Sequence, residues 1–293
     1  MSAFAAEVER VWPGRNVQFE VLGGGITNHN LKVTVDGEAF VLRVAGKDTA
    51  LLGIDRTVEL AATKAAAALG IGPVVVAFVE PEGWLVTRFV DGEIPPITRM
   101  READMLARVA DALRAFHGGP AIPGTFDSFR VVEAYRQIAL DRGGDVPTAF
   151  AWGHEIAARI EERRRGADEP VPCHNDLLNA NFLHDGRDLF IVDWEYAGMG
   201  DRFFDLANFS INHELDAAAS AALLVAYFGE AHEEHERALE LMRFMSDFRE
   251  AMWGVVQSAV SELDFDFAGY AADHFERLER TALTPEFVAA LEP

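Results

Sequence analysis

The sequence predicts an α+β protein of two lobes, a small β-rich lobe over residues 1–90 and a larger, mainly helical lobe over residues 91–293. Up to residue 89, short runs of β-branched and alternating residues are separated by turn signals. Beyond residue 91, the apolar residues recur at helical spacing in much longer segments. A chain of 293 residues is long enough for each lobe to bury its own core.

Five strands and one helix account for the first lobe. The strands are expected at residues 17–22, 30–35, 39–44, 74–79 and 84–89. Asp36-Gly37 is a strong hairpin signal between the second and third strands, and Gly23-Gly24-Gly25 follows the first. The helix is expected over residues 56–69, where Gly70 and then Gly72-Pro73 end it.

The second lobe is predicted to be helical with one interruption. Helices are expected at residues 102–116, 131–140, 148–165, 203–212, 217–228, 235–250 and 268–281. Between residues 171 and 194 the pattern changes, with short strands expected around 182–183 and 189–192. A small β-rich lobe, a connector and a helical lobe that contains a hairpin are the order of parts typical of kinase-like phosphotransferases.

The charge balance narrows the class of partner. Forty-eight acidic residues against 26 Lys and Arg give a net charge of −22, which disfavours nucleic acid and anionic membranes as partners. The same acidity would attract a cation to a carboxylate-lined cleft, although solubility alone also explains it. The single cysteine, Cys173, and the lack of a signal-like or membrane-length apolar run predict a cytoplasmic protein.

The most informative stretch is HNDLLNANFL at residues 174–183, followed by IVDWEY at residues 191–196. Phosphoryl transfer requires a carboxylate that orients the attacking hydroxyl, and oxygen ligands that hold Mg²⁺ against the phosphates. Asp176 and Asn181 have the spacing of a kinase base and metal-binding Asn, and Asp193 ends an apolar strand. A lone Asp would more simply be a turn or helix cap, but the complete string favours catalysis.

These two blocks, with Asp205-Leu206-Ala207-Asn208 after them, resemble the signature of the choline/ethanolamine kinase family. That family is a branch of the aminoglycoside-phosphotransferase-like kinases, which have a protein-kinase-like fold, and the resemblance covers most of the chain. It implies that Asp176 is the catalytic base and that Asn181 and Asp193 bind Mg²⁺. The residues implied to support the catalytic loop are His174, Asp205 and Asn208.

The resemblance also implies a nucleotide site in the first lobe. The loop residues assigned to the phosphates are Gly24, Gly25, Thr27 and Asn28, although a glycine-rich hairpin alone is equally typical of a simple turn. Arg43, on an otherwise apolar strand, is expected to contact the α- and β-phosphates and to pair with Glu59. Backbone groups near Arg88 and Val90 are expected to bind adenine, and ATP rather than GTP is implied by the family alone.

The acceptor is expected to be a small cationic amino alcohol, because the tail of the chain resembles the segment that supplies the family's aromatic box. A quaternary ammonium is recognised by aromatic faces and nearby carboxylates. The residues expected around the acceptor are Asp176, Glu195, Tyr196, Trp253, Phe267 and Tyr270. The family often has a second Trp where this chain has Val256, and a carboxylate near the position of Asn212, so choline, ethanolamine and relatives stay open.

Two other interpretations keep part of this chemistry. One is a kinase of another amine-bearing acceptor, such as an aminoglycoside, thiamine or an amino sugar. An aminoglycoside pocket would be wide and lined mostly by carboxylates. The other is a nucleotide-binding pseudokinase that acts as a regulator, but the joint presence of Asp176, Asn181 and Asp193 argues against it.

Overall fold

The computed structural model describes residues 4–23, 28–46 and 49–292. The chain divides into two compact units, which are described separately. The first unit comprises Met1–Pro95 and Ala180–Tyr196, and the second comprises Pro96–Asn179 and Ala197–Pro293.

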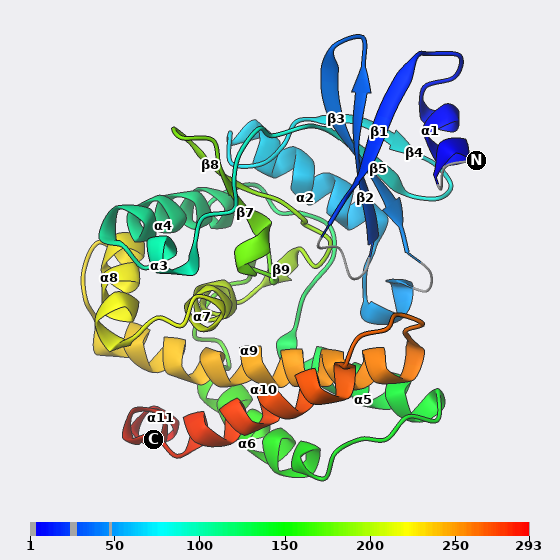
Figure 1. Ribbon diagram of the computed structural model, residues 1–293. Helices are drawn as coiled ribbons and strands as arrows, with labels where there is room; N and C mark the ends of the chain where they lie inside the picture. The colour runs from blue at the N-terminus through cyan, green and yellow to red at the C-terminus, as the bar shows by residue number, and fades with distance from the viewer. Residues whose placement is uncertain (1–3, 24–27, 47–48, 293) are drawn as a thin grey trace. The chain divides into compact units, whose positions relative to one another are not determined.

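A five-stranded antiparallel sheet forms the centre of the first unit (Figure 1). Its order is β1 (Val17–Leu22), β2 (Asn28–Val35), β3 (Glu38–Ala45), β5 (Trp84–Arg88) and β4 (Val75–Val79). Asp36 and Gly37 both have positive φ, 53° and 86°, as a tight hairpin between β2 and β3 requires. Alternate residues of β2 and β3, such as Leu31, Val33 and Leu42, are fully buried and form the core of the sheet.

Three helical segments accompany this sheet. They are α1 (Ala5–Val11), the 3₁₀ turn η1 (Thr49–Leu52) and α2 (Arg56–Ala68). Asp55 caps α2 by accepting hydrogen bonds from the amides of Thr57 at 2.8 Å and Val58 at 3.3 Å. This cap fixes the start of the helix that carries Arg56 and Glu59.

Residues 180–196 group with the first unit, whereas the sequence predicted that they would lie in the second lobe. They form the hairpin β7 (Phe182–His184) and β8 (Leu189–Ile191). Glu93 and His184 exchange backbone hydrogen bonds of 3.0 and 2.9 Å, and the Ile191 amide donates to the Ile71 carbonyl at 2.7 Å. These backbone pairings explain the grouping, and they also place the unit boundary at Pro95 rather than at residue 90.

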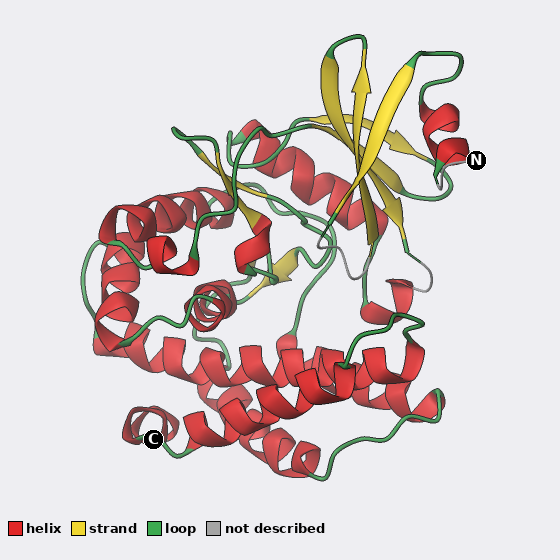
Figure 2. Cartoon of the chain, in the orientation of Figure 1, coloured by secondary structure: helices red, strands yellow, loops and turns green. Residues whose placement is uncertain are grey.

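The second unit is mainly helical, as its composition predicted (Figure 2). Its helices are α3 (Ile97–Met100), α4 (Ala103–His117), α5 (Ser128–Asp141), α6 (Ala149–Arg164), α7 (Arg202–Asn212), α8 (Ala217–Phe228), α9 (Glu233–Val260), α10 (Phe267–Ala282) and α11 (Pro285–Leu291). A two-stranded ladder joins β6 (Val171–Cys173) to β9 (Gly198–Gly200), and the 3₁₀ turn η2 (Asn179–Asn181) follows β6. The long helix α9 packs against α5, α7 and α10 and so forms the core of this unit.

Helix α9 is longer than the predicted segment of residues 235–250, because it continues to Val260. Gly254 lies inside this extension, where a glycine would weaken an exposed helix. In the structure, a Cβ atom at Gly254 would lie 3.0 Å from the Ala271 Cβ and 3.1 Å from the Phe267 carbonyl oxygen. The glycine therefore allows α10 to approach α9 closely, and this packing offsets its low helix propensity.

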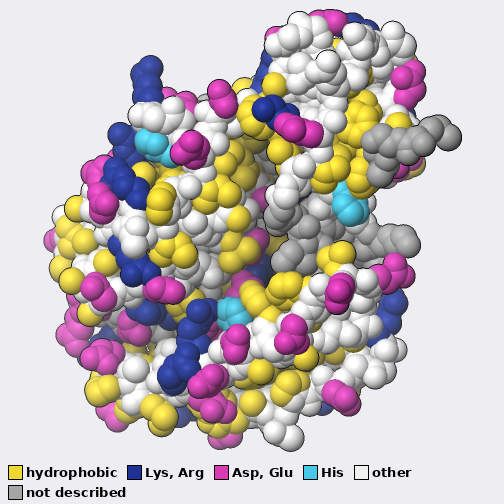
Figure 3. Space-filling model, in the orientation of Figure 1, with side chains coloured by type: hydrophobic (Ala, Val, Ile, Leu, Met, Phe, Trp, Pro, Cys, Tyr) yellow, Lys and Arg dark blue, Asp and Glu magenta, His cyan; other side chains and the backbone are white. Residues whose placement is uncertain are grey.

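Across the described residues, none of the helices combines the length and the apolar character that crossing a bilayer demands. On the face shown in Figure 3, acidic and basic side chains are interspersed rather than gathered by sign. The excess of carboxylates is therefore spread over this face.

Candidate active site

The loop after β6 positions Asp176 in the second unit. The backbone amides of His174 and Asn175 donate to the two carboxylate oxygens of Asp205, at 2.8 and 2.6 Å. Asn175 has a φ of 68°, a left-handed conformation that L-residues adopt rarely. Since Asp205 is fully buried on α7, these charge-assisted hydrogen bonds hold the loop in that conformation immediately before Asp176.

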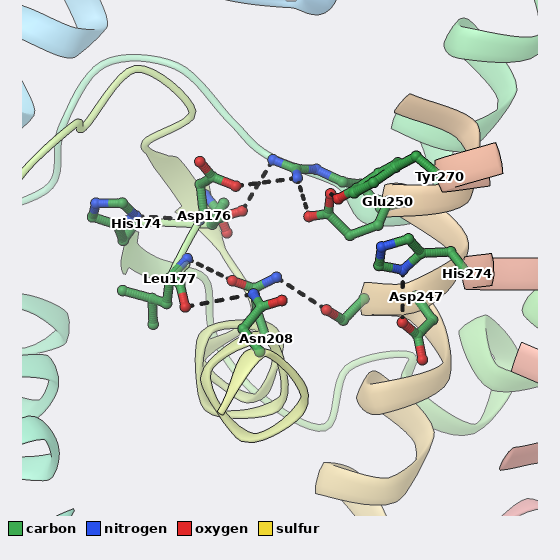
Figure 4. A network of polar contacts seen from close by, with 12 residues as sticks. His174, Asp176, Leu177, Asn208, Asp247, Glu250, Tyr270 and His274 are labelled. Atoms are coloured by element: carbon green, nitrogen blue, oxygen red, sulfur yellow. Dashed lines mark hydrogen bonds and ion pairs between the residues drawn. The ribbon is translucent and has the colours of Figure 1, made fainter. Parts of the chain in front are cut away.

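The same helix holds the loop on the other side of Asp176 (Figure 4). The Leu177 amide donates to the Asn208 side-chain oxygen at 2.5 Å, and the Asn208 amide group donates to Ser246 Oγ at 3.0 Å. His174 Nδ1 accepts a hydrogen bond from the Asp176 amide at 3.2 Å. The predicted supporting residues His174, Asp205 and Asn208 thus all contact the loop that carries Asp176.

A buried cluster behind Asp205 was missed by sequence reasoning. His117 Nε2 lies 3.0 Å from Asp205 Oδ2, and His117 Nδ1 lies 2.7 Å from the Tyr227 hydroxyl. Burial raises the pKa of Tyr227 to about 12, so the phenol stays protonated. His117 is separated from Asp205 by 88 positions, so no local sequence pattern could have linked them.

His117, Cys173 and Asp205 are close enough to form a metal-ligand set, but their contacts favour a structural role. Both ring nitrogens of His117 already face Asp205 and Tyr227. Burial raises the pKa of the Cys173 thiol well above its usual value, which disfavours the thiolate that binds metals and attacks electrophiles. Cys173 is itself fully buried.

Arg249, on α9, was also missed. Its guanidinium contacts Asp176 Oδ1 at 3.3 Å and the Asn175 carbonyl oxygen at 3.2 Å, and it pairs with Glu250. An arginine in a long helix is usually a solvated residue, but Arg249 is only 1% exposed. This exposure could not be read from the sequence, which places Arg249 73 positions from Asp176.

The three aromatic residues predicted around the acceptor do lie together in the second unit. The Trp253 ring lies 5.8 Å from the Phe267 ring and 5.6 Å from the Tyr270 ring, both edge to face. The Tyr270 hydroxyl donates to Glu250 Oε2 at 2.8 Å, and burial raises the pKa of Tyr270, which keeps that hydroxyl protonated. Glu250, one helical turn before Trp253, adds a buried carboxylate that the sequence did not single out.

In the first unit, Arg43 on β3 is the centre of a buried charge cluster. It pairs with Glu59 on α2, as predicted, and also with the carboxylate of Asp193, which follows β8. Asp193 has a φ of 64°, so the backbone turns sharply at this carboxylate. Strained positions of this kind are frequent at functional sites.

Glu195 lies in a second part of this cluster. Asn28 Nδ2 donates to Glu195 Oε2 at 2.8 Å, and Arg56 pairs with Glu195 at 3.0 Å and with Glu59 at 2.7 Å. Burial, followed by the nearby Asp193 charge, raises the pKa of Glu195, although its arginine partners oppose this. Asn28 was predicted to bind the nucleotide and Glu195 the acceptor, but in the structure the two side chains contact each other. Arg56, which the sequence analysis did not single out, contacts both of them.

A pocket in the first unit combines an apolar wall with a polar end. The apolar wall includes Val41, Leu85, Leu183 and Val192. The polar end includes Arg43, Asn181 and Asp193, and the connector residues Arg88, Phe89 and Val90 also line the pocket. The predicted phosphate-loop residues Gly24, Gly25 and Thr27 lie outside the described residues.

Asn181 and Asp193 provide oxygen donors at the same pocket, which is the donor chemistry that Mg²⁺ prefers. The Val192 amide donates to the Asn181 carbonyl at 2.9 Å, so the backbone around both residues is joined. These residues belong to the first unit and Asp176 to the second. Tyr196, the remaining predicted acceptor contact, is a buried residue of the first unit.

Comparison with known proteins gives relatives that cover most of the chain. The protein LicA of Haemophilus influenzae is 26% identical over an alignment of 265 positions, which covers 84% of this chain and 75% of LicA. Mouse ethanolamine kinase 2 is 27% identical over an alignment of 305 positions, which covers 92% of this chain and 78% of that kinase.

Among solved structures, a choline/ethanolamine kinase family protein from Mesorhizobium loti superimposes with a TM-score of 0.84 at 28% identity. The match covers 99% of this chain and 98% of that one. The predicted two-lobed, protein-kinase-like fold is therefore confirmed. Residues 18–243, well over half of the chain, match the model of the phosphotransferase enzyme family, and the chain belongs to that family.

Proposed function

We propose that this phosphotransferase is an ATP-dependent kinase of a small amino alcohol, with choline and ethanolamine as the leading acceptors. The observation that carries the proposal is the cluster of Trp253, Phe267 and Tyr270 beside the buried carboxylate of Glu250. Aromatic faces and a nearby carboxylate both attract an organic ammonium group, and they give no such attraction to a neutral or anionic acceptor.

The nucleotide is assigned to the pocket of the first unit. Val41, Leu85 and Val192 offer the apolar surface that a purine ring requires, and backbone groups near Arg88 and Val90 supply its hydrogen bonds. Arg43 at the polar end binds the phosphates, where Glu59 keeps its guanidinium oriented. Gly24, Gly25, Thr27 and Asn28 complete the phosphate loop in this proposal.

Asn181 and Asp193 are proposed to hold Mg²⁺ at the phosphates. When bound, the ion neutralises phosphate charge that develops during transfer. Asp193 also pairs with Arg43, so the cation of the protein and the ion's carboxylate ligand lie at the same end of the pocket. Glu195 and Tyr196 follow directly in the chain and are assigned to the acceptor side.

Asp176 is proposed to orient the acceptor hydroxyl and to take its proton as the oxygen attacks the γ-phosphorus. This role requires a fixed carboxylate, because catalysis depends on the alignment of the attacking oxygen. The hydrogen bonds that the flanking backbone amides donate to Asp205 and Asn208 supply that rigidity. The relatives named as ethanolamine kinases support an amino-alcohol acceptor for this chain.

The test is ADP release from Mg·ATP with a panel of choline, ethanolamine, their N-methylated intermediates, thiamine, amino sugars and an aminoglycoside. We expect turnover with choline or ethanolamine. Asp176→Asn is the matched control, and it should lose about 10³-fold in kcat while it binds nucleotide normally. Turnover only with an aminoglycoside, thiamine or an amino sugar would overturn the acceptor assignment. No ADP release with any of the acceptors would overturn the assignment as a kinase.

A further inference from the structure

Arg249 makes its contacts to the loop of Asp176 from a buried position on α9. One of its terminal nitrogens lies 3.3 Å from Asp176 Oδ1, and the other donates to the Asn175 carbonyl oxygen at 3.2 Å. A single planar guanidinium therefore touches the carboxylate of Asp176 and the backbone of the residue before it. This two-point contact restrains both the side chain and the peptide group.

The restraint acts at the strained point of the loop. Asn175 has its left-handed φ of 68°, its amide donates to Asp205, and its carbonyl accepts from Arg249. Helix α7 thus holds the peptide group before Asn175, and α9 holds the peptide group after it. An error of about 1 Å in the placement of a catalytic group can cost about 10²-fold in rate, so such a clamp has a direct kinetic consequence.

Arg249 is almost fully buried and lies between two carboxylates. Its guanidinium lies between Asp176 and Glu250, and Glu250 in turn accepts the hydrogen bond of the Tyr270 hydroxyl (Figure 4). Arg249 stays protonated in proteins, and a neighbouring cation favours the ionised form of a carboxylate. The row Asp176, Arg249, Glu250 and Tyr270 therefore links the proposed base to the aromatic cluster.

We infer that Arg249 is a positioning residue for phosphoryl transfer, which acts by holding the carboxylate of Asp176 in place, with Glu250 as its counterion. This inference rests on the proposed function, since it takes Asp176 as the base. Helix α9 would then carry both Trp253, which is proposed to contact the acceptor, and Arg249, which positions Asp176. Arg249 contacts the Asp176 carboxylate and the loop backbone directly, and it reaches the proposed acceptor site only as the counterion of Glu250, so its loss should lower kcat much more than it raises the acceptor KM.

The experiment compares Arg249→Met and Arg249→Lys with the matched controls Arg243→Met and Arg243→Lys. Arg243 lies on the same helix and pairs with Glu240. We expect Arg249→Met to lower kcat about 10²-fold, with the acceptor KM and the nucleotide Kd within about threefold of wild type. Arg249→Lys should restore part of kcat because it keeps the charge, and both Arg243 variants should match wild type.

A double variant separates positioning from general damage to the fold. In an Asp176→Asn background the carboxylate on which Arg249 acts is absent, so adding Arg249→Met should lower residual turnover by less than about threefold. In the double variant the Asp176–Arg249 pair loses both charges, and Glu250 loses its cation just as it does in Arg249→Met alone, so the two backgrounds differ only in the carboxylate of Asp176. Circular dichroism and the nucleotide Kd report whether each variant is folded.

The inference would be overturned if the loss of kcat in the double variant equalled the product of the losses in Asp176→Asn and Arg249→Met. An unchanged kcat in a folded Arg249→Met protein would also overturn it. An equal loss with Arg249→Lys and Arg249→Met, together with weaker nucleotide binding, would also overturn it. A wild-type protein that phosphorylates none of the acceptors would instead remove the proposed function, and this inference with it. The two failures are thus distinguished by the activity of the wild-type protein.

Discussion

Replacing Asp205 with Asn should separate the alignment of the catalytic loop from nucleotide binding. Asp205 accepts hydrogen bonds from two backbone amides, at 2.8 and 2.6 Å, while it is fully buried. Asn keeps one acceptor oxygen but turns an amide donor toward the second N–H group. The variant thus loses one hydrogen bond to a charged acceptor and leaves a buried donor unsatisfied, which together cost about 3–5 kcal/mol.

In a unit of this size, such a loss should lower the melting temperature by about 8–15 °C. We also expect kcat to fall about 10²-fold, because the peptide before Asp176 is no longer held in its left-handed conformation. The nucleotide Kd should stay within about twofold, since the pocket assigned to the nucleotide is built from residues of the first unit. Differential scanning fluorimetry, steady-state kinetics and calorimetric titration with a nucleotide measure these three quantities.

Asp201→Asn provides the matched control on the same helix. Asp201 is the N-cap of α7 and accepts a hydrogen bond from the Phe203 amide at 2.8 Å. Asn is as good a cap as Asp, but it gives up the ion pair of Asp201 with Arg164 at 2.7 Å, so this variant should lose about 1 kcal/mol and keep its kcat. A wild-type melting temperature and kcat in Asp205→Asn, or a nucleotide affinity that falls as far as kcat, would refute the proposed role of Asp205.

Trp253→Ala should raise the acceptor KM about 5- to 30-fold and change kcat less, because an aromatic wall contributes about 1–2 kcal/mol to the binding of a cation. An unchanged KM in steady-state kinetics would mean that the acceptor binds elsewhere. His213 is buried, and burial lowers its pKa to about 4. Between that value and about 6.5 the unfolded chain binds a proton that the folded chain does not, so stability should fall as the pH drops through this window. His213→Asn keeps a donor for the Phe209 carbonyl, which lies 2.8 Å from His213 Nδ1, and it should flatten the pH dependence of the unfolding free energy measured in urea. A pH dependence that matches wild type would exclude His213 as the cause.

Several parts of the site could be predicted because they depend on short stretches of chain. The β2–β3 hairpin was expected from Asp36-Gly37, whose positive φ angles the structure confirms. Asp176, Asn181 and Asp193 were found through their spacing, and Glu59 through its place on the helix after the strand of Arg43. In each case the signal is a local conformational preference or a fixed distance along the chain.

The contacts that support these residues could not be predicted in the same way. His117 meets Asp205 and Arg249 meets Asp176 only after helices distant in sequence have packed together. The length of α9 was underestimated for a related reason, since Gly254 weakens a helix by itself and fits only because α10 packs against it. Local helix propensity does not include the packing energy that offsets an unfavourable residue such as Gly254.

By itself, the sequence determined the two-lobed α+β class, the catalytic string and the family resemblance, because strand alternation, turn chemistry and motif spacing act over a few residues. Only the tertiary structure decided that residues 180–196 group with the sheet, that Glu195 faces Arg56 and Asn28, and that Glu250 joins the aromatic cluster. The physical reason is that burial and charge pairing depend on which distant side chains exclude water together. Whether an arginine such as Arg249 is a solvated surface group or the buried partner of a carboxylate such as Asp176 is settled by that packing.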